Sequence, residues 1–154
     1  MGMFRPTEPR EALEMDTIVV AAKAGTDEPW VADAAAELAG QTGAAARVVS
    51  IDGVDVETLS PTPRSEMTEI ARKSAEATAT RLRDKGVDAS AEVRPGRVVR
   101  GILVYAEEVE ADMIVVGASR LGPVARRLLG DVPLELVQRS RRPVLVVSAP
   151  SEKE

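Results

Sequence analysis

Residues 111–117 read Ala-Asp-Met-Ile-Val-Val-Gly, a β-branched apolar run that ends on a glycine. Such a run predicts a buried strand, and Gly117 allows the backbone to turn sharply where that strand ends. Residues 142–147, Arg-Pro-Val-Leu-Val-Val, predict a second strand. Between the two strands we expect a helix that begins at Asp131, because aspartate is a preferred N-cap residue. A strand, a helix and another strand in this order are typical of a parallel sheet.

Strands and helices alternate in the same way towards the amino terminus. We expect strands at about residues 17–23, 46–52 and 88–94 and helices at about residues 29–40, 64–85 and 98–109. This alternation predicts an α/β fold with a single open five-stranded parallel sheet, strand order 3-2-1-4-5, and helices on both faces. In that order the switch point lies between the first and fourth strands. Loops 23–28 and 118–127 would then flank the crevice where ligands of such sheets bind.

The chain is long enough for one domain. It has 154 residues, of which 44% are hydrophobic, and this length suits one core rather than two. Residues 1–16 are polar and contain proline, so we expect a mobile N-terminal tail there. The domain is predicted to span residues 17–149 and to be followed by a C-terminal tail at residues 150–154.

The composition excludes several classes of function. The net charge of −5 argues against a nucleic-acid partner, because phosphate backbones require a basic face. Cysteine and histidine are absent, which excludes disulfides, Cys/His metal sites and the commonest general base. We therefore expect no metal site and no catalytic residue. No apolar run approaches the roughly 18 residues that span a membrane, so a cytoplasmic protein without a membrane partner is expected.

The sequence after Gly117 matches neither of two familiar motifs, the phosphate-binding Walker A loop and the catalytic nucleophile elbow. Gly117 and Gly122 have the spacing that opens a Walker A loop, but residues 123–124 are Pro-Val where Lys and Ser/Thr are required. Ser119 follows the glycine as in a nucleophile elbow, yet Leu121 occupies the second glycine position. No histidine is present to activate this serine. Ser119 is therefore interpreted as an ordinary loop residue.

The block from the fourth to the fifth strand resembles the signature of the universal stress protein family, and the resemblance covers about residues 17–147. It implies an ATP phosphate loop with the pattern G-x-x-G-x9-G-[S/T]. The corresponding positions here are Gly117, Ala118, Ser119, Arg120, Gly130 and Asp131. Arg120 replaces the second glycine, and Asp131 replaces the Ser/Thr. A carboxylate about 4 Å from a phosphate charge costs on the order of 4 kcal/mol at an effective dielectric of 20, several hundredfold or more in affinity.

The resemblance also implies two contacts at the ends of the first two strands. Nucleotide-binding members tend to carry an aspartate at the end of the first strand, where this chain has Lys23. The main chain at Ile51 corresponds to the position that contacts adenine. Lys23 has two open interpretations: it contacts a ligand, or it forms an ion pair with Asp52 at the end of the neighbouring strand. Asp131 likewise either only caps its helix or also opposes a phosphate.

These observations favour a non-enzymatic regulatory or protective homodimer with a degenerate ATP loop, which binds ATP weakly or not at all. Any enzymatic activity would be limited to slow ATP hydrolysis, and no cofactor is required. The alternative is an adenine-nucleotide binder (AMP, a cyclic nucleotide or ATP), or a binder of another small anion, that uses Lys23 and Arg120. The apolar edge strand that forms the dimer is expected to comprise Val144, Leu145, Val146 and Val147. The resemblance implies that this strand pairs antiparallel across a two-fold axis.

Overall fold

The computed structural model describes residues 14–53, 63–118 and 131–150. The elements, in chain order, are β1 (Thr17–Ala21), α1 (Pro29–Thr42), β2 (Ala45–Ile51), α3 (Arg64–Asp84), β3 (Ala89–Arg94), α4 (Val98–Glu108), β4 (Met113–Gly117), α6 (Val132–Arg139) and β5 (Val144–Val147). Each strand and helix expected from the sequence is present, with small differences at the ends. The side chain of Asp131 accepts a hydrogen bond from Leu134 N at 3.1 Å, which confirms the predicted N-cap of α6.

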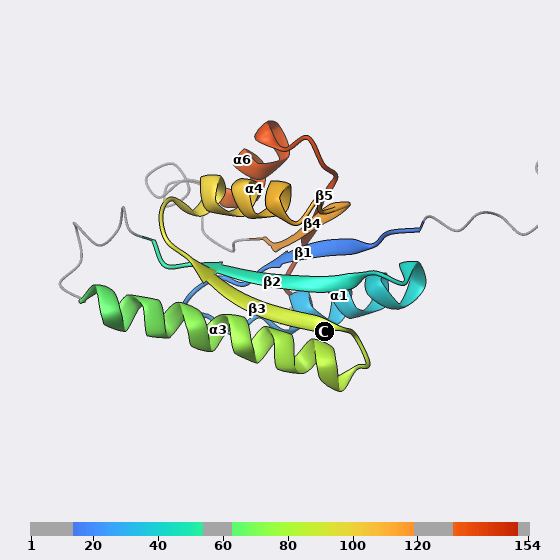
Figure 1. Cartoon of the computed structure of the whole chain (residues 1–154), viewed down its shortest axis with the longest axis horizontal. Coiled ribbons are helices and arrows are strands. Elements are labelled where there is room, and N and C mark those ends of the chain that lie inside the picture. Colours follow the sequence, from blue (N-terminus) through green and yellow to red (C-terminus); the bar gives the residue numbers. More distant parts are fainter. Residues whose placement is uncertain (1–13, 54–62, 119–130, 151–154) are drawn as a thin grey trace, which may run out of the picture.

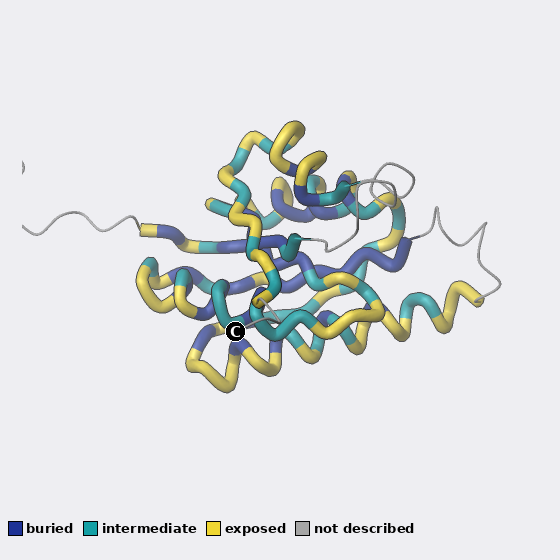
Figure 2. The backbone as a smooth tube through the Cα atoms, turned by 180° about the vertical axis from the view of Figure 1, so that it is seen from behind, coloured by how far each residue is buried: buried dark blue, intermediate teal, exposed yellow. Residues whose placement is uncertain are grey.

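The five strands form one parallel sheet in the order β3-β2-β1-β4-β5 (Figure 1), which confirms the predicted topology. Helices α1 and α3 cover one face, and α4 and α6 cover the other. Successive strand residues alternate between two cores, because strand side chains point to opposite faces. Ile18 and Val20 belong to the core beneath α1 and α3, whereas Val19 and Ile114 belong to the core beneath α4 and α6. Figure 2 shows the central strands buried and the outer sides of the helices exposed.

Small side chains bring the helices close to the sheet. The buried faces of α1 and α3 are rich in alanine, and Leu82 near the end of α3 is fully buried. On the other face, a Cβ atom added to Gly101 of α4 would lie 2.7 Å from Ile51 Cδ1. A glycine at this position therefore lets α4 approach β2 and fixes where the Ile51 side chain lies.

The two edges of the sheet differ in their protection. β3 pairs with β2 on one side, which confirms it as an edge strand, and Arg94 ties it to α4 through Glu108 and the Tyr105 ring. β5 pairs with β4 and leaves Leu145 and Val146 37% and 38% exposed. The apolar β5 edge is therefore the less protected of the two.

The beginning of the fold lies earlier than the sequence boundary at residue 17. Met15 is buried in the core, and Asp16 N donates a hydrogen bond to Asp112 Oδ2 at 2.8 Å. Met15 and Asp16 therefore belong to the folded domain and not to the expected N-terminal tail. Residues 1–13 and 151–154 lie outside the described residues. Within the described part of the chain, no helix is both long and apolar enough to cross a membrane.

Candidate functional site

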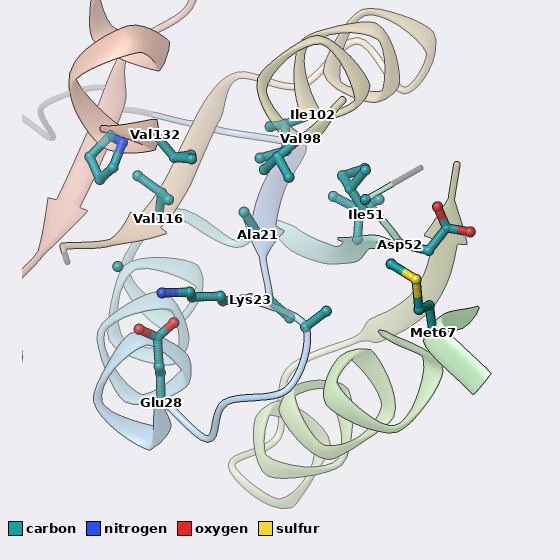
Figure 3. A pocket seen from close by; sticks show the side chains of 16 residues that line it. Ala21, Lys23, Glu28, Ile51, Asp52, Met67, Val98, Ile102, Val116 and Val132 are labelled. Carbon is teal, nitrogen blue, oxygen red and sulfur yellow. The ribbon is translucent and has the colours of Figure 1, made fainter. Parts of the chain in front are cut away.

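A cavity of about 460 Å³ lies at the carboxyl ends of β1, β2 and β4 (Figure 3). This is the crevice predicted at the switch point, because β1 and β4 are neighbours in the sheet. Sites for small molecules typically occupy about 300–1,000 Å³, so the cavity is large enough for a ligand. Its apolar wall includes residues from the strand ends and from α3, α4 and α6, namely Ala21, Val49, Ile51, Met67, Val98, Ile102, Val116, Val132 and Pro133.

Charged side chains lie at two separate ends of this apolar wall. Among the described residues that line the cavity, they are Lys23, Glu28 and Asp52. Lys23 and Glu28 come from the loop between β1 and α1, and Figure 3 shows Lys23 pointing toward Glu28. Asp52 follows β2 and lies at the other end of the view. The cavity is therefore apolar in the middle and polar at its ends.

The loop that carries Lys23 is held by two contacts. The Lys23 carbonyl oxygen accepts a hydrogen bond from Thr26 Oγ1 at 3.1 Å, and Gly25 N donates to Ser74 Oγ on α3 at 2.9 Å. Lys23 itself is an exposed residue. These contacts fix the backbone of the loop and leave the lysine side chain available at the mouth of the cavity.

Glu28 is a charged residue of the candidate site that the sequence interpretation missed. Burial raises the pKa of its carboxyl group, and the nearby charge of Lys23 partly offsets that effect. A Cβ atom added to Gly117 would lie 3.1 Å from both Glu28 carboxylate oxygens and 2.9 Å from Val31 Cγ2. Gly117 is thus needed for the close approach of the start of α1. The sequence did contain a signal for Glu28, because it is an acidic residue in loop 23–28, which was predicted to flank the crevice.

Asp52 does not neutralise Lys23, so this interpretation of the sequence is wrong. The Asp52 residue is only 6% exposed, and its Oδ2 atom accepts from Thr68 Oγ1 at 3.2 Å and lies 3.4 Å from Arg64 Nη2. Both partners belong to α3. The Lys23 side chain points away from Asp52 and toward Glu28.

The predicted phosphate loop is only partly described. Gly117 lines the cavity. Ala118 N donates a hydrogen bond to Val147 O at 2.8 Å, so, contrary to the expectation from the sequence, this amide is not available to bind a ligand. Ser119, Arg120 and Gly130 lie outside the described residues. Asp131 immediately precedes Val132, which lines the cavity. Its carboxylate caps α6 through the bond from Leu134 N, and Asp131 is not among the residues that line the cavity.

The universal stress protein family model matches residues 14–148. The chain belongs to this family. A crystal structure of a universal stress protein in complex with cAMP is 27% identical, with a TM-score of 0.69, and the match covers 89% of this chain and 99% of that one. The universal stress protein from Archaeoglobus fulgidus in complex with dAMP is 22% identical, with a TM-score of 0.64 and coverage of 88% and 98%.

Protein Rv1636 from Mycobacterium tuberculosis H37Rv is 26% identical to this universal stress protein, with a TM-score of 0.54 and coverage of 89% and 98%. No curated protein matches the chain significantly. The family and its Rossmann-like fold are thus established, and some structural neighbours carry adenine nucleotides.

Proposed function

We propose that this chain is a non-enzymatic regulatory or protective universal stress protein whose crevice binds ATP weakly or not at all. The observation that carries the proposal is the placement of carboxylates around the crevice. Glu28 lines it next to Gly117, and Asp131 caps the helix whose first residue lines it. A triphosphate bound at this end would meet negative charge on two sides, whereas Lys23 offers a single positive charge.

The second candidate function is the binding of an adenine mononucleotide, such as AMP or a cyclic nucleotide. Three features favour it: an apolar wall of suitable size for a base, the charged side chain of Lys23 at one end, and the nucleotide complexes of the similar structures. One phosphate needs less positive charge than three do. Lys23 would hold the phosphate, with Arg120 as the second cation that the sequence suggests.

The base would lie at the β2 end of the cavity, against Ile51. Within the described residues, the last hydrogen bond between β1 and β2 joins Ala22 N to Val49 O at 2.8 Å. Ile51 extends beyond this pairing and lines the cavity. This supports a contact between the Ile51 main chain and a ligand, which is the contact that the family resemblance implies.

Removal of the Lys23 charge tests the mononucleotide site. We expect Lys23→Ala to weaken AMP binding about tenfold or more, because a charge-assisted hydrogen bond to phosphate contributes about 1.5–3 kcal/mol. Isothermal calorimetry with AMP, cyclic AMP, ATP and inorganic phosphate measures the effect, and binding should weaken as salt is added. Lys73→Ala removes an exposed lysine from α3 and serves as the matched control. Equal affinities of wild type and Lys23→Ala would reject the anion site.

We also propose that the protein forms a homodimer through β5. The Leu145 and Val146 side chains are exposed, and one side of β5 pairs with no strand among the described residues, which supports an edge that pairs with a second copy.

The dimer proposal predicts that Val146→Lys converts the dimer to a monomer, because a charged side chain at a paired edge opposes association. Light scattering at micromolar concentration would show the mass fall by half. Val104→Lys places the same charge at a residue of α4 that is 43% exposed, and it should leave the mass unchanged. A monomeric wild-type protein would contradict the proposal, as would an unchanged mass of Val146→Lys.

A further inference from the structure

Two opposite charges lie at the same end of the cavity without a direct bond between them. Lys23 and Glu28 both line the cavity, and the Lys23 side chain points toward the Glu28 carboxylate (Figure 3). Within the described part of the chain, no hydrogen bond or ion pair joins the two groups, and the lysine charge acts on the carboxyl group through space. The pair is therefore open to a third charged group.

The carboxylate of Glu28 lies at the surface of the cavity. Both of its oxygens are 3.1 Å from the Cβ position of Gly117, which itself lines the cavity. Glu28 is the N-cap residue of α1, but its side chain makes no capping hydrogen bond. The residue is half-buried, and its oxygens are not among the buried, unpaired atoms of the described residues. They are therefore accessible to solvent or to a ligand.

A phosphate that approaches Lys23 also approaches Glu28. When Glu28 is ionised, its charge offsets the attraction of Lys23 and repels the phosphate. When Glu28 carries a proton, the repulsion disappears and the lysine charge is unopposed. Because the repulsion grows with the charge of the ligand, it opposes a phosphomonoester with two negative charges more than a phosphodiester with one.

The surroundings of Glu28 favour its protonated form. Burial raises the pKa of its carboxyl group, and Lys23 offsets this in part. The other charged side chains at the adjoining ends of its loop, α1 and α6 are Asp27, Asp33 and Asp131, all acidic, and β4 and β5 carry none. The sequence contains no histidine or cysteine, the side chains that ordinarily titrate closest to neutral pH. A bound phosphate would raise the pKa of Glu28 further.

We propose that Glu28 couples anion binding in this cavity to the uptake of a proton. A phosphate that pairs with Lys23 binds together with a proton that the Glu28 carboxylate takes from solvent. Glu28 is thus a specificity-determining residue, which favours singly charged ligands and ligands that bind at lower pH. This inference rests on the proposed mononucleotide site.

Calorimetric titration of cyclic AMP against the full-length protein tests the coupling. Its phosphodiester keeps one charge from about pH 5.5 to about pH 8, whereas a phosphomonoester loses its second proton near about pH 6. We expect wild type to bind more tightly as the pH falls through this range, and heats in buffers of different ionisation enthalpy to show proton uptake. Glu28→Gln should bind at least about fivefold more tightly than wild type at about pH 8. Its affinity should be independent of pH, and the two affinities should approach each other at low pH.

Glu37→Gln is the matched control, because it makes the same change at an exposed residue of α1. It should keep the affinity and the pH dependence of wild type, and thermal unfolding reports whether each variant is folded. Binding of cyclic AMP by wild type without proton uptake would overturn the coupling and leave the mononucleotide site intact. Proton uptake that persists in Glu28→Gln would also overturn the coupling. If neither wild type nor Glu28→Gln binds at any pH in the range, both proposals fail.

Discussion

Replacing Asp131 by serine is expected to strengthen ATP binding several hundredfold. In the proposed site the carboxylate would oppose a phosphate, and its removal would recover on the order of 4 kcal/mol for charges about 4 Å apart at an effective dielectric of 20. Serine also caps helices, so the bond to Leu134 N and the start of α6 should be retained. Calorimetry with ATP, with and without magnesium, measures the gain. Adding Arg120→Gly should increase it further, because a glycine permits closer approach of the backbone.

Two comparisons separate the charge of Asp131 from its capping role. Asp131→Asn removes the charge and keeps a capping side chain, so it should gain ATP affinity without loss of stability. Asp131→Ala should gain affinity as well but lower the free energy of unfolding by about 1 kcal/mol. A low-micromolar dissociation constant of the unmodified protein for ATP would show that Asp131 and Arg120 do not impair the site.

Leu136→Ala should lower both the free energy of unfolding and the affinity for a ligand, and we expect the loss of stability to exceed that of the other substitutions described above. Pro133 and Leu136 are the buried residues of α6, and Leu136 is completely buried. Leucine-to-alanine changes in cores cost about 2–5 kcal/mol, against a typical total stability of about 5–15 kcal/mol. An eight-residue helix is too short to be stable alone, so its packing depends on this side chain. Weaker docking of α6 also displaces Val132 from the cavity wall.

Leu134→Ala provides the control for this experiment, because Leu134 lies on the same helix and is 53% exposed. Its effect on the free energy of unfolding should stay within about 0.5 kcal/mol. Urea denaturation measures both variants, and AMP titration shows whether the cavity remains competent. Equal destabilisation by the two substitutions would mean that Leu136 does not anchor α6.

The fold was accessible from sequence because its signals are local. The β-branched runs at residues 113–117 and 17–21 identify strands through their composition, and the alternation of strands with helices then restricts the topology. Asp131 was assigned as an N-cap from its chemistry and position alone. Each of these inferences needs only neighbouring residues or a general rule of chain connection.

The details of the site were less accessible because they depend on elements distant in sequence. The ends of β1 and β2 suggested that Lys23 pairs with Asp52, but α3 brings Arg64 and Thr68 to Asp52. The raised pKa of Glu28 depends on burial, which no local pattern reports. The hydrogen bond from Ala118 N follows from the register of β4 and β5. Long side chains and strand registers are settled only by tertiary packing.

Helix α3 supports both polar ends of the cavity. Ser74 holds the loop of Lys23 through Gly25, and Thr68 holds the carboxylate of Asp52. A ligand that spans the cavity would therefore contact two regions that are both hydrogen-bonded to α3. The opposite side of α3 faces solvent, so this one helix separates the cavity from an outer surface of the molecule.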